Sequence, residues 1–326
     1  MKTTVIGYAV ALSLALVGAY QTWTHEGDPD LSDATVILDV DRDELEVVTF
    51  DSPTATLVLE PRKDERGAYV WGRVTPKAGD EGSDPKPEQS FKVGPAGETL
   101  MNGMAPFVAK RVLEGVDASK LEELGFGEEQ ATLTLQRAGK EPKAYEVGAR
   151  VYGGRNRYVR DPDAGTVYIV ATNVVQQLET GATTLPDRSL VGVDTTDIET
   201  ITVRGGEAEV TYAQNNPDDR AARFWAQQGS AEPNAAAAGW FDKVLNLRIA
   251  RYIDDANRPA GLEEAFSMVV TSGRTSTEVV VYRAFDDEGQ EAWYATSPHN
   301  RVLVQLNPSK GTEIYADLAS VLDDGA

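Results

Sequence analysis

The fold is decided by two ten-residue stretches that match each other without a gap, DRDELEVVTF at residues 41–50 and DTTDIETITV at residues 194–203. Asp, Glu and Thr recur at identical steps in both, and apolar residues alternate with polar ones between them. Such alternation is typical of a strand with one buried face. Each half of the chain is therefore predicted to open with the same strand.

The similarity continues beyond these stretches at nearly constant offsets. The matching segments are Ala55–Leu59 with Ala208–Tyr212, Tyr69–Trp71 with Arg223–Trp225, Leu124–Phe126 with Ala260–Leu262, and Ala131–Leu135 with Ser267–Thr271. Self-similarity on this scale indicates a repeated structural unit. Chance similarity between two β-rich, acidic segments is the alternative explanation.

Helical patterns follow the opening strands in each half. Apolar residues recur at helical spacing at Val108, Val112 and Val116 in the first half and at Trp240, Val244 and Leu247 in the second. Each half closes on another helical run, at Thr172–Thr180 and Glu313–Leu322. We therefore predict an α+β fold of two tandem similar modules, each roughly β-β-β-α-β-β-β-α with mainly antiparallel sheets, preceded by one N-terminal transmembrane helix.

The N-terminus carries an apolar segment. Every residue from Val5 to Tyr20 except Ser13 is apolar or small, and Lys2 is the only charged residue before it. With its flanks, the segment approaches the ~20 residues that span a hydrocarbon core. The charge bias places the N-terminus in the cytoplasm and the folded part in the periplasm. We therefore predict an inner-membrane, single-pass anchor over residues 1–24.

A cleavable signal peptide is the alternative, because Val17-Gly18-Ala19 offers the small residues that a signal peptidase prefers. Beyond the anchor we predict a linker over residues 25–34, a first α+β module over 35–190 and a second over 191–326. Two further linkers are predicted within the modules, at Pro76–Ser90, which is rich in Gly, Pro and charged residues, and at the alanine-rich Ala231–Gly239.

Composition excludes several function classes. The formal net charge of −21 argues against nucleic acid as a partner, because phosphate binding needs clustered Lys and Arg. So acidic a surface favours solubility, with an acidic docking face for a basic partner as the alternative. The chain has no cysteine, which excludes disulfides, thiol catalysis and cysteine-ligated metal.

Motifs for catalysis or metal binding are scarce. The only histidines are His25 and His299, and His299 is predicted to be a solvated residue of a turn. The run Asp39–Asp43 resembles the start of a calcium loop, but Glu44 stands where that loop needs glycine and Phe50 where it needs a carboxylate. We therefore expect no catalytic residue, metal or cofactor.

Two kinds of charged cluster remain. Adjacent carboxylates are interpreted as helix starts or solvated turns, at Glu122-Glu123, Glu128-Glu129, Asp254-Asp255 and Glu263-Glu264. Basic residues gather around Gly153-Gly154, at Arg150, Arg155, Arg157 and Arg160. This basic cluster predicts either a site for an anion or acidic partner or simply a charged hairpin end.

The order of these motifs resembles that of DUF4340, a bacterial domain of unknown function. The resemblance rests on the Asp-x-x-x-Leu/Ile pattern that starts at Asp41 and Asp194, on strands that end at Trp71 and Trp225, and on the Gly-containing turns after the helices. It covers Ile37 to Asp324 in two tandem copies. The Pro76–Ser90 insertion and the lack of proline after Leu124–Phe126 depart from the family pattern.

The resemblance implies an anchored envelope protein and, through the genes that often neighbour this family, an accessory role beside an ABC export system of the gliding-motility type. It supplies no catalytic residues. We therefore predict a membrane-anchored, non-catalytic interaction protein with envelope protein partners. Two alternatives stay open: an envelope hydrolase that uses carboxylates such as Asp41 or Asp194, and a periplasmic small-ligand sensor with a cleft between the modules.

Overall fold

The computed structural model describes residues 34–77, 87–127, 130–217, 219, 221–285 and 288–323. Several predicted features lie outside these residues, namely the anchor, His25, nearly all of the linker 25–34, the centre of the Pro76–Ser90 insertion and the Glu128-Glu129 pair. Among the residues that the structure describes, no helix has the length and apolar character needed to cross a bilayer.

The first half of the chain forms a nine-stranded antiparallel sheet with the strand order β5-β4-β3-β2-β8-β9-β10-β11-β7. Its strands are β2 (Leu45–Asp51), β3 (Ala55–Asp64), β4 (Gly67–Pro76), β5 (Gln89–Lys92), β7 (Arg111–Leu113), β8 (Ala131–Arg137), β9 (Lys143–Arg150), β10 (Asn156–Asp161) and β11 (Thr166–Ala171). A separate two-stranded ladder joins β1 (Thr35–Leu38) to β6 (Phe107–Ala109).

The second half forms an eight-stranded antiparallel sheet with the order β14-β13-β12-β16-β17-β18-β19-β15. Its strands are β12 (Thr200–Gly205), β13 (Ala208–Asn215), β14 (Phe224–Gln227), β15 (Ile249–Tyr252), β16 (Glu263–Ser272), β17 (Thr275–Phe285), β18 (Glu291–Thr296) and β19 (Val304–Leu306). Both halves are thus mostly antiparallel sheet with a few helices, which confirms the predicted α+β class.

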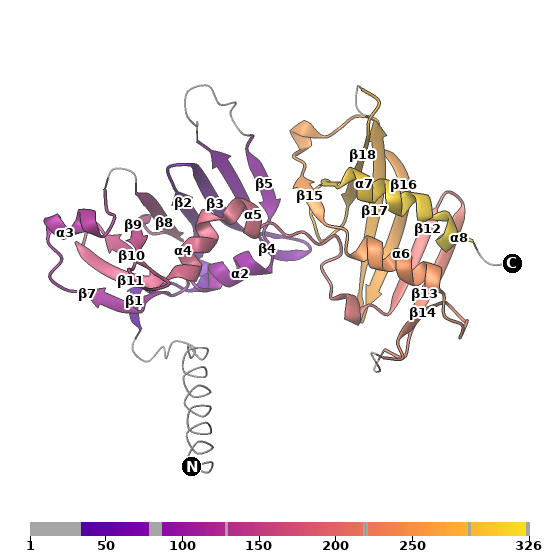
Figure 1. The fold of residues 1–326 in the computed structure, drawn as a ribbon, viewed down its shortest axis with the longest axis horizontal. Helices are drawn as coiled ribbons and strands as arrows, with labels where there is room; N and C mark the ends of the chain where they lie inside the picture. Colours follow the sequence, from indigo (N-terminus) through magenta and orange to yellow (C-terminus); the bar gives the residue numbers. More distant parts are fainter. Residues whose placement is uncertain are drawn as a thin grey trace, which may run out of the picture.

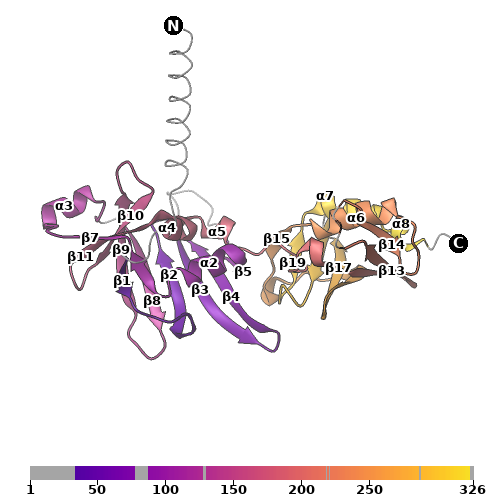
Figure 2. The same cartoon turned by 90° about the horizontal axis from the view of Figure 1, so that it is seen from below.

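Short helices accompany each sheet, and the two sheets lie side by side along the long axis of the molecule (Figures 1 and 2). The first half contains α2 (Pro95–Asn102), α3 (Ala118–Glu123), α4 (Thr172–Glu179) and α5 (Gly181–Thr184). The second contains α6 (Ala235–Leu245), α7 (Pro308–Asp317) and α8 (Ala319–Leu322). Single 3₁₀ turns occur at η2 (Arg42–Glu44), η3 (Thr195–Asp197) and η4 (Asp255–Asn257).

Helices cover one face of each sheet and bury its apolar residues. Gly181 of α5 lies against Leu57, so closely that a Cβ there would be 2.7 Å from the leucine. In the second half, Trp240 of α6 is 2% exposed and donates its indole N–H to the carbonyl oxygen of Ile314 in α7 at 2.9 Å. Alternation along the strands therefore places the core between sheet and helices.

The opposite face of each sheet carries small, polar and half-exposed residues. In the first sheet one cross-strand row consists of Arg73, Val58, Thr49, Thr134 and Ala144. In the second sheet the row consists of Thr211, Thr202, Val269 and Glu278. We call the surfaces around these rows the open faces.

Two predictions about helices are wrong. Val108 lies in β6 and Val112 in β7, and the first helix after the opening strands is α2, several residues earlier. Residues four apart share a face in a strand as well as in a helix, and β-branched valine favours the strand. The proposed linker Ala231–Gly239 runs into α6, because Asn234 caps the helix by accepting from the backbone N–H of Ala237 and alanine then propagates it.

The predicted unit also contained too few strands. Six strands, β6–β11, follow α2 in the first half and five, β15–β19, follow α6 in the second, where the sequence predicted three in each half. The opening strands are confirmed at β2–β4 and β12–β14. The predicted turns are confirmed as well, since Gly125 and Gly261 have φ of 81° and 67°, which glycine adopts without steric cost.

Candidate functional site

The two sheets meet at unlike edges, where β5 of the first lies against β15 of the second. The rings of Trp71 and Tyr252 pack edge to face across this junction, with centroids 6.0 Å apart. Residues 185–193, the crossing segment, connect the sheets and bond to the end of β5, because the backbone N–H of Asp187 donates to the carbonyl oxygen of Lys92 at 2.8 Å. Both halves thus contribute to one continuous core.

Three ionisable side chains from distant parts of the chain converge at this junction. Asp187 Oδ2 lies 2.7 Å from Lys92 Nζ and 2.7 Å from His299 Nε2. Lys92 Nζ and His299 Nε2 are 3.3 Å apart. The side chains are 12%, 8% and 22% exposed for Lys92, Asp187 and His299 respectively. We call these three residues the Asp187 cluster.

Asp187 is held in its ionised form. Burial alone raises the pKa of a carboxyl group, but the hydrogen bonds from His299 and Lys92 and the charge of Lys92 outweigh it, so the pKa of Asp187 lies well below its usual range. Its second oxygen accepts from the backbone N–H of Ser189 at 3.0 Å. Because its two oxygens accept from Lys92 of the first half, Ser189 of the crossing segment and His299 of the second half, the arrangement suits the carboxylate to join the two sheets.

The prediction that His299 is a solvated turn residue is wrong. His299 does lie in a turn, between Ser297 and Asn300, but its ring is packed into the junction against Gly192 and Asp187. Gly192 has a φ of 69°, and a Cβ at this position would overlap the imidazole ring. No local signal in the sequence could reveal this contact, since Asp187 and His299 are 112 residues apart.

Further polar contacts surround the Asp187 cluster. Arg301 Nε lies 2.8 Å from Asp64 Oδ2, and the guanidinium also stacks over Tyr69 at 5.1 Å from the ring centroid. Ser90 donates to Asp254 Oδ1 at 2.6 Å. Burial and the nearby charge of Asp187 raise the pKa of Tyr252, whose hydroxyl donates to the carbonyl oxygen of Asp187 at 2.9 Å. Each bond links the first half or the crossing segment to the second half.

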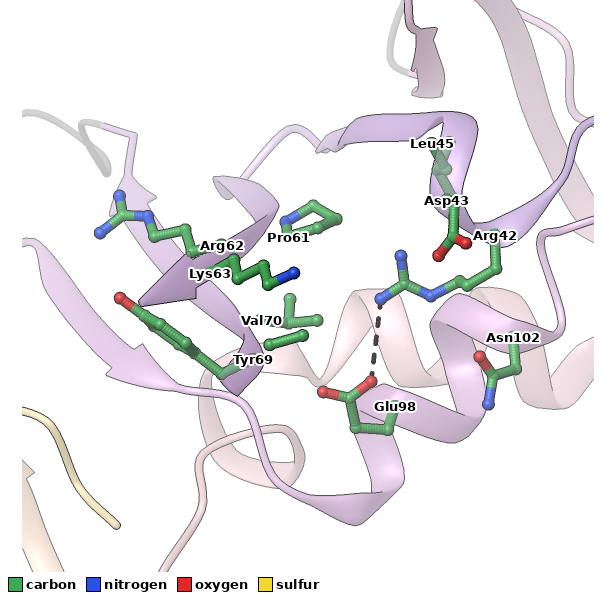
Figure 3. Close-up of a pocket in the computed structure, with 11 residues that line it drawn as sticks. Arg42, Asp43, Leu45, Pro61, Arg62, Lys63, Tyr69, Val70, Glu98 and Asn102 are labelled. Carbon is green, nitrogen blue, oxygen red and sulfur yellow. Dashed lines mark ion pairs between the residues drawn. The ribbon is translucent and has the colours of Figure 1, made fainter. Parts of the chain in front are cut away.

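A separate cavity of about 530 Å³ opens between α2 and the ends of β3 and β4 (Figure 3). Arg42 and Glu98 face each other at its rim, with Nη2 and Oε2 3.7 Å apart, and Lys63 points into it. Asp43 and Asn102 complete its polar wall. The mixture of charges suits a polar or zwitterionic ligand.

Asp41 and Asp194, the acids of the hydrolase hypothesis, are exposed and begin separate 3₁₀ turns in the two halves. The side chain of Asp194 accepts from the backbone and hydroxyl of Thr196, and these bonds lower its pKa. A general acid at neutral pH needs a raised pKa, so the environment of Asp194 opposes that role. Among the described residues no group of His, Asp and Glu is arranged to hold a metal ion.

Two arginines of the basic cluster form ion pairs, and the other two form none with a carboxylate in the described part of the chain. Arg160 contacts Glu146 at 2.8 Å, and Arg157 contacts Glu179. Arg150 and Arg155 instead line a cavity beside the start of α4. The sequence therefore predicted a real concentration of cations, of which only these two arginines face the cavity.

The comparisons with known proteins identify the family. A domain of unknown function, DUF4340, matches residues 98–265, which is about half of the chain. The chain belongs to the DUF4340 family. The DUF4340 match is one continuous stretch from α2 to β16 that includes the crossing segment, whereas the resemblance predicted two copies between Ile37 and Asp324. No curated protein and no solved structure matches this DUF4340 chain.

Proposed function

We propose that this protein is held in the inner membrane by residues 1–24, with its N-terminus in the cytoplasm, and acts in the periplasm as a non-catalytic accessory subunit of an envelope transport or motility complex of the ABC type. The open faces of the two sheets carry the proposal. They present rows of half-exposed threonine and valine flanked by charges, as at Thr134 and Thr202. Broad surfaces of this kind bind partners by packing and hydrogen bonding and need no reactive group.

The two halves are proposed to be copies of one module, which gives the protein two comparable binding surfaces. The first sheet contains the strand order β4-β3-β2-β8-β9-β10-β11-β7, and the second has the order β14-β13-β12-β16-β17-β18-β19-β15. The two orders correspond position by position when the strands of each half are numbered along the chain. In both halves a helix precedes the edge strand β7 or β15, and helices follow the last strand. This agreement supports duplication over chance similarity of two short motifs.

The polar chemistry at the junction supports a structural role for the most reactive residues. His299, the one histidine that the structure describes, is bonded to Asp187, and Asp187 to Lys92. The contacts with His299 and Lys92 hold Asp187 in its ionised form, and the ring of His299 is packed against Gly192, so both side chains are part of the packing of the junction. The genomic setting implied by family membership supplies the expectation of an ABC-type partner.

Photo-crosslinking in native membranes tests the proposal. A photoreactive amino acid is placed at Thr134 or Thr202 on the open faces, with matched controls at the exposed helix positions Thr99 and Ser320. We expect adducts with an inner-membrane protein from the open faces and not from the controls. Absence of any envelope adduct from both faces, or equal adducts from all four positions, would contradict the proposal.

Membrane topology is tested separately. Protease added to spheroplasts digests the folded part if it lies in the periplasm, while lysis is required if it lies in the cytoplasm. Removal of residues 1–24 is expected to release the protein from the membrane fraction. Digestion only after lysis would overturn the periplasmic assignment without bearing on the crosslinks.

A small-ligand sensor is the second candidate, because a cavity of about 400 Å³ lies at the seam between the halves. Arg66 from the first half faces residues of the second that include Asp255, Arg258 and Ser297. Thermal-shift screening of the full chain with sugars, peptides and metals tests this candidate. A stabilising ligand should lose its effect in Arg66→Gln and keep it in Lys140→Gln, whose exposed side chain lies elsewhere.

A further inference from the structure

An open cavity of about 620 Å³ lies at the end of the first sheet far from the second. Its walls come from the β9–β10 hairpin, the link between β6 and β7, and the first turns of α4. The described residues that line it include no carboxylate. They include three cations and three side-chain amides, namely Lys110, Arg150, Arg155, Asn156, Asn173 and Gln176. This composition is unusual in a protein with a net charge of −21.

The three cations have no counter-ion within the described part of the chain. Arg157 and Arg160 on the neighbouring strand each contact a glutamate, but none of Lys110, Arg150 and Arg155 forms an ion pair with a described carboxylate. Their positive potential is felt locally, since burial and then the charge of Arg150 lower the pKa of Arg157. An anion in the cavity would therefore meet uncompensated positive charge.

The start of α4 adds donors to the same cavity. Its N-cap residue is Ala171, whose methyl side chain cannot accept from the first backbone N–H groups, and the first turn contains no acidic residue. A helix N-terminus carries partial positive charge and directs its first N–H groups outward, and of these the N–H of Thr172 already donates to the carbonyl oxygen of Arg155 at 3.1 Å. Asn173 and Gln176 offer amide N–H groups beside them. Cations, amides and helix terminus together provide the donors that a phosphate oxygen accepts.

The cavity also lies where the described chain begins. Thr35 of β1 pairs with Ala109 of β6, so the chain enters the fold next to Lys110. Only the linker 25–34 separates this point from the proposed anchor, a distance of at most roughly 35 Å. Tyr152, at the tip of the hairpin that carries Arg150 and Arg155, has a fully exposed side chain. Exposed tyrosine beside cations is typical of surfaces that face a bilayer interface.

We propose that this cavity binds a phosphate group, carried by an anionic lipid headgroup or by a soluble phosphate compound. Lys110, Arg150 and Arg155 bind its oxygens and the start of α4 orients them. Beside an anionic membrane the rest of the acidic surface is repelled, so the cavity would set the orientation of the first sheet. The lipid source rests on the proposed anchoring, whereas the phosphate site itself does not.

The first measurement uses the full chain in detergent and inorganic phosphate as the probe, with sulfate for comparison, by calorimetry at low ionic strength. The variant Lys110→Gln/Arg150→Gln/Arg155→Gln should weaken phosphate binding on the order of tenfold or more, because charge-assisted bonds are lost. The control Lys140→Gln/Arg248→Gln/Arg274→Gln removes three exposed cations elsewhere, so both variants lose the same number of positive charges. Equal weakening in both variants, or no phosphate binding by the wild type, would overturn the proposal.

The second measurement identifies the source. The full chain in nanodiscs of phosphatidylcholine, with or without phosphatidylglycerol, is compared by hydrogen exchange over residues 108–114, 150–156 and 171–177. Protection that needs phosphatidylglycerol and disappears in the first variant supports a lipid headgroup. Phosphate binding without lipid-dependent protection supports a soluble phosphate compound. Failure of the chain to insert in nanodiscs would contradict the proposed anchor, but it would not affect the calorimetric test of phosphate binding.

Discussion

The two sheets share one strand order but differ at their edges, and that difference decides how the molecule is assembled. The first sheet has an additional edge strand, β5, outside β4, whereas β14 forms the corresponding edge of the second sheet without such an addition. Lys92 of β5 supplies the cation of the Asp187 cluster. The second sheet meets it with its opposite edge, β15. One added strand thus turns a free edge into an interface and leaves β7 and β14 at the two ends.

The halves also differ in what they bury and in what they leave charged. The second sheet and its helices enclose an aromatic cluster in which Trp240 contacts Phe241 and Phe266. The first sheet has three cations at its outer end that form no ion pair with a carboxylate in the described residues. Sheets with the same strand order can therefore carry different surface chemistry, because side chains outside the core are weakly constrained by packing.

Removal of Asp187 is expected to have the largest effect on the stability of the junction between the sheets. Asp187→Ala leaves Lys92 buried without its partner, and loss of one member of a buried ion pair costs about 3–5 kcal/mol. We therefore expect a lower free energy of unfolding, measured by urea denaturation. The control Asp317→Ala breaks an exposed pair with Lys243 and should lose far less. Similar losses in both variants would contradict the role of the junction.

Acidification should weaken the same junction. The pKa of Asp187 is lower in the folded protein than its unfolded value of about 3.9, so its contribution to stability is complete above that pH and is lost as the pH falls further. The free energy of unfolding of the wild type should therefore approach that of Asp187→Asn as the pH is lowered below about 4. A difference between the two proteins that stays constant with pH would show that the charge is not involved.

Gly192→Ala tests the packing of the junction without removing a charge. The alanine would adopt a positive φ and place its Cβ in the ring of His299, so we expect a loss of about 1–3 kcal/mol in urea unfolding. Gly206→Ala is the matched control, since Gly206 has a φ of 59° and nothing within 4 Å of an added Cβ. The loss in Gly192→Ala should exceed that in the control, and equal losses would indicate backbone strain alone.

The smallest effect is expected on an open face. The hydroxyls of Thr202 and Thr211 form a cross-strand hydrogen bond at 2.9 Å, and such pairs contribute about 0.2–1 kcal/mol. Thr202→Val should therefore change thermal stability only slightly while altering the surface proposed to bind a partner. A loss comparable to that of Asp187→Ala would mean that this face is part of the core.

Much of the fold could be predicted from local pattern. Alternation identified β2 and β12, and glycine marked the turns at Gly125 and Gly261, because side-chain period and backbone sterics act within a few residues. The apolar pattern gave a wrong prediction at Val108 and Val112, because a spacing of four residues fits both a helix and a strand. The short strands β7 and β15 were not predicted, because so few residues show too little periodicity to indicate a strand.

The family, the α+β class and the concentration of cations around Gly153-Gly154 could be inferred from the residues themselves. The contact between His299 and Asp187, the meeting of β5 with β15, and the cavity that two of the four arginines share with Lys110 become visible only in the folded chain. The difference arises from how far apart in the chain the interacting residues are. Strand and turn preferences arise between neighbours in the chain, whereas a contact between distant residues depends on which sheet edges pack together.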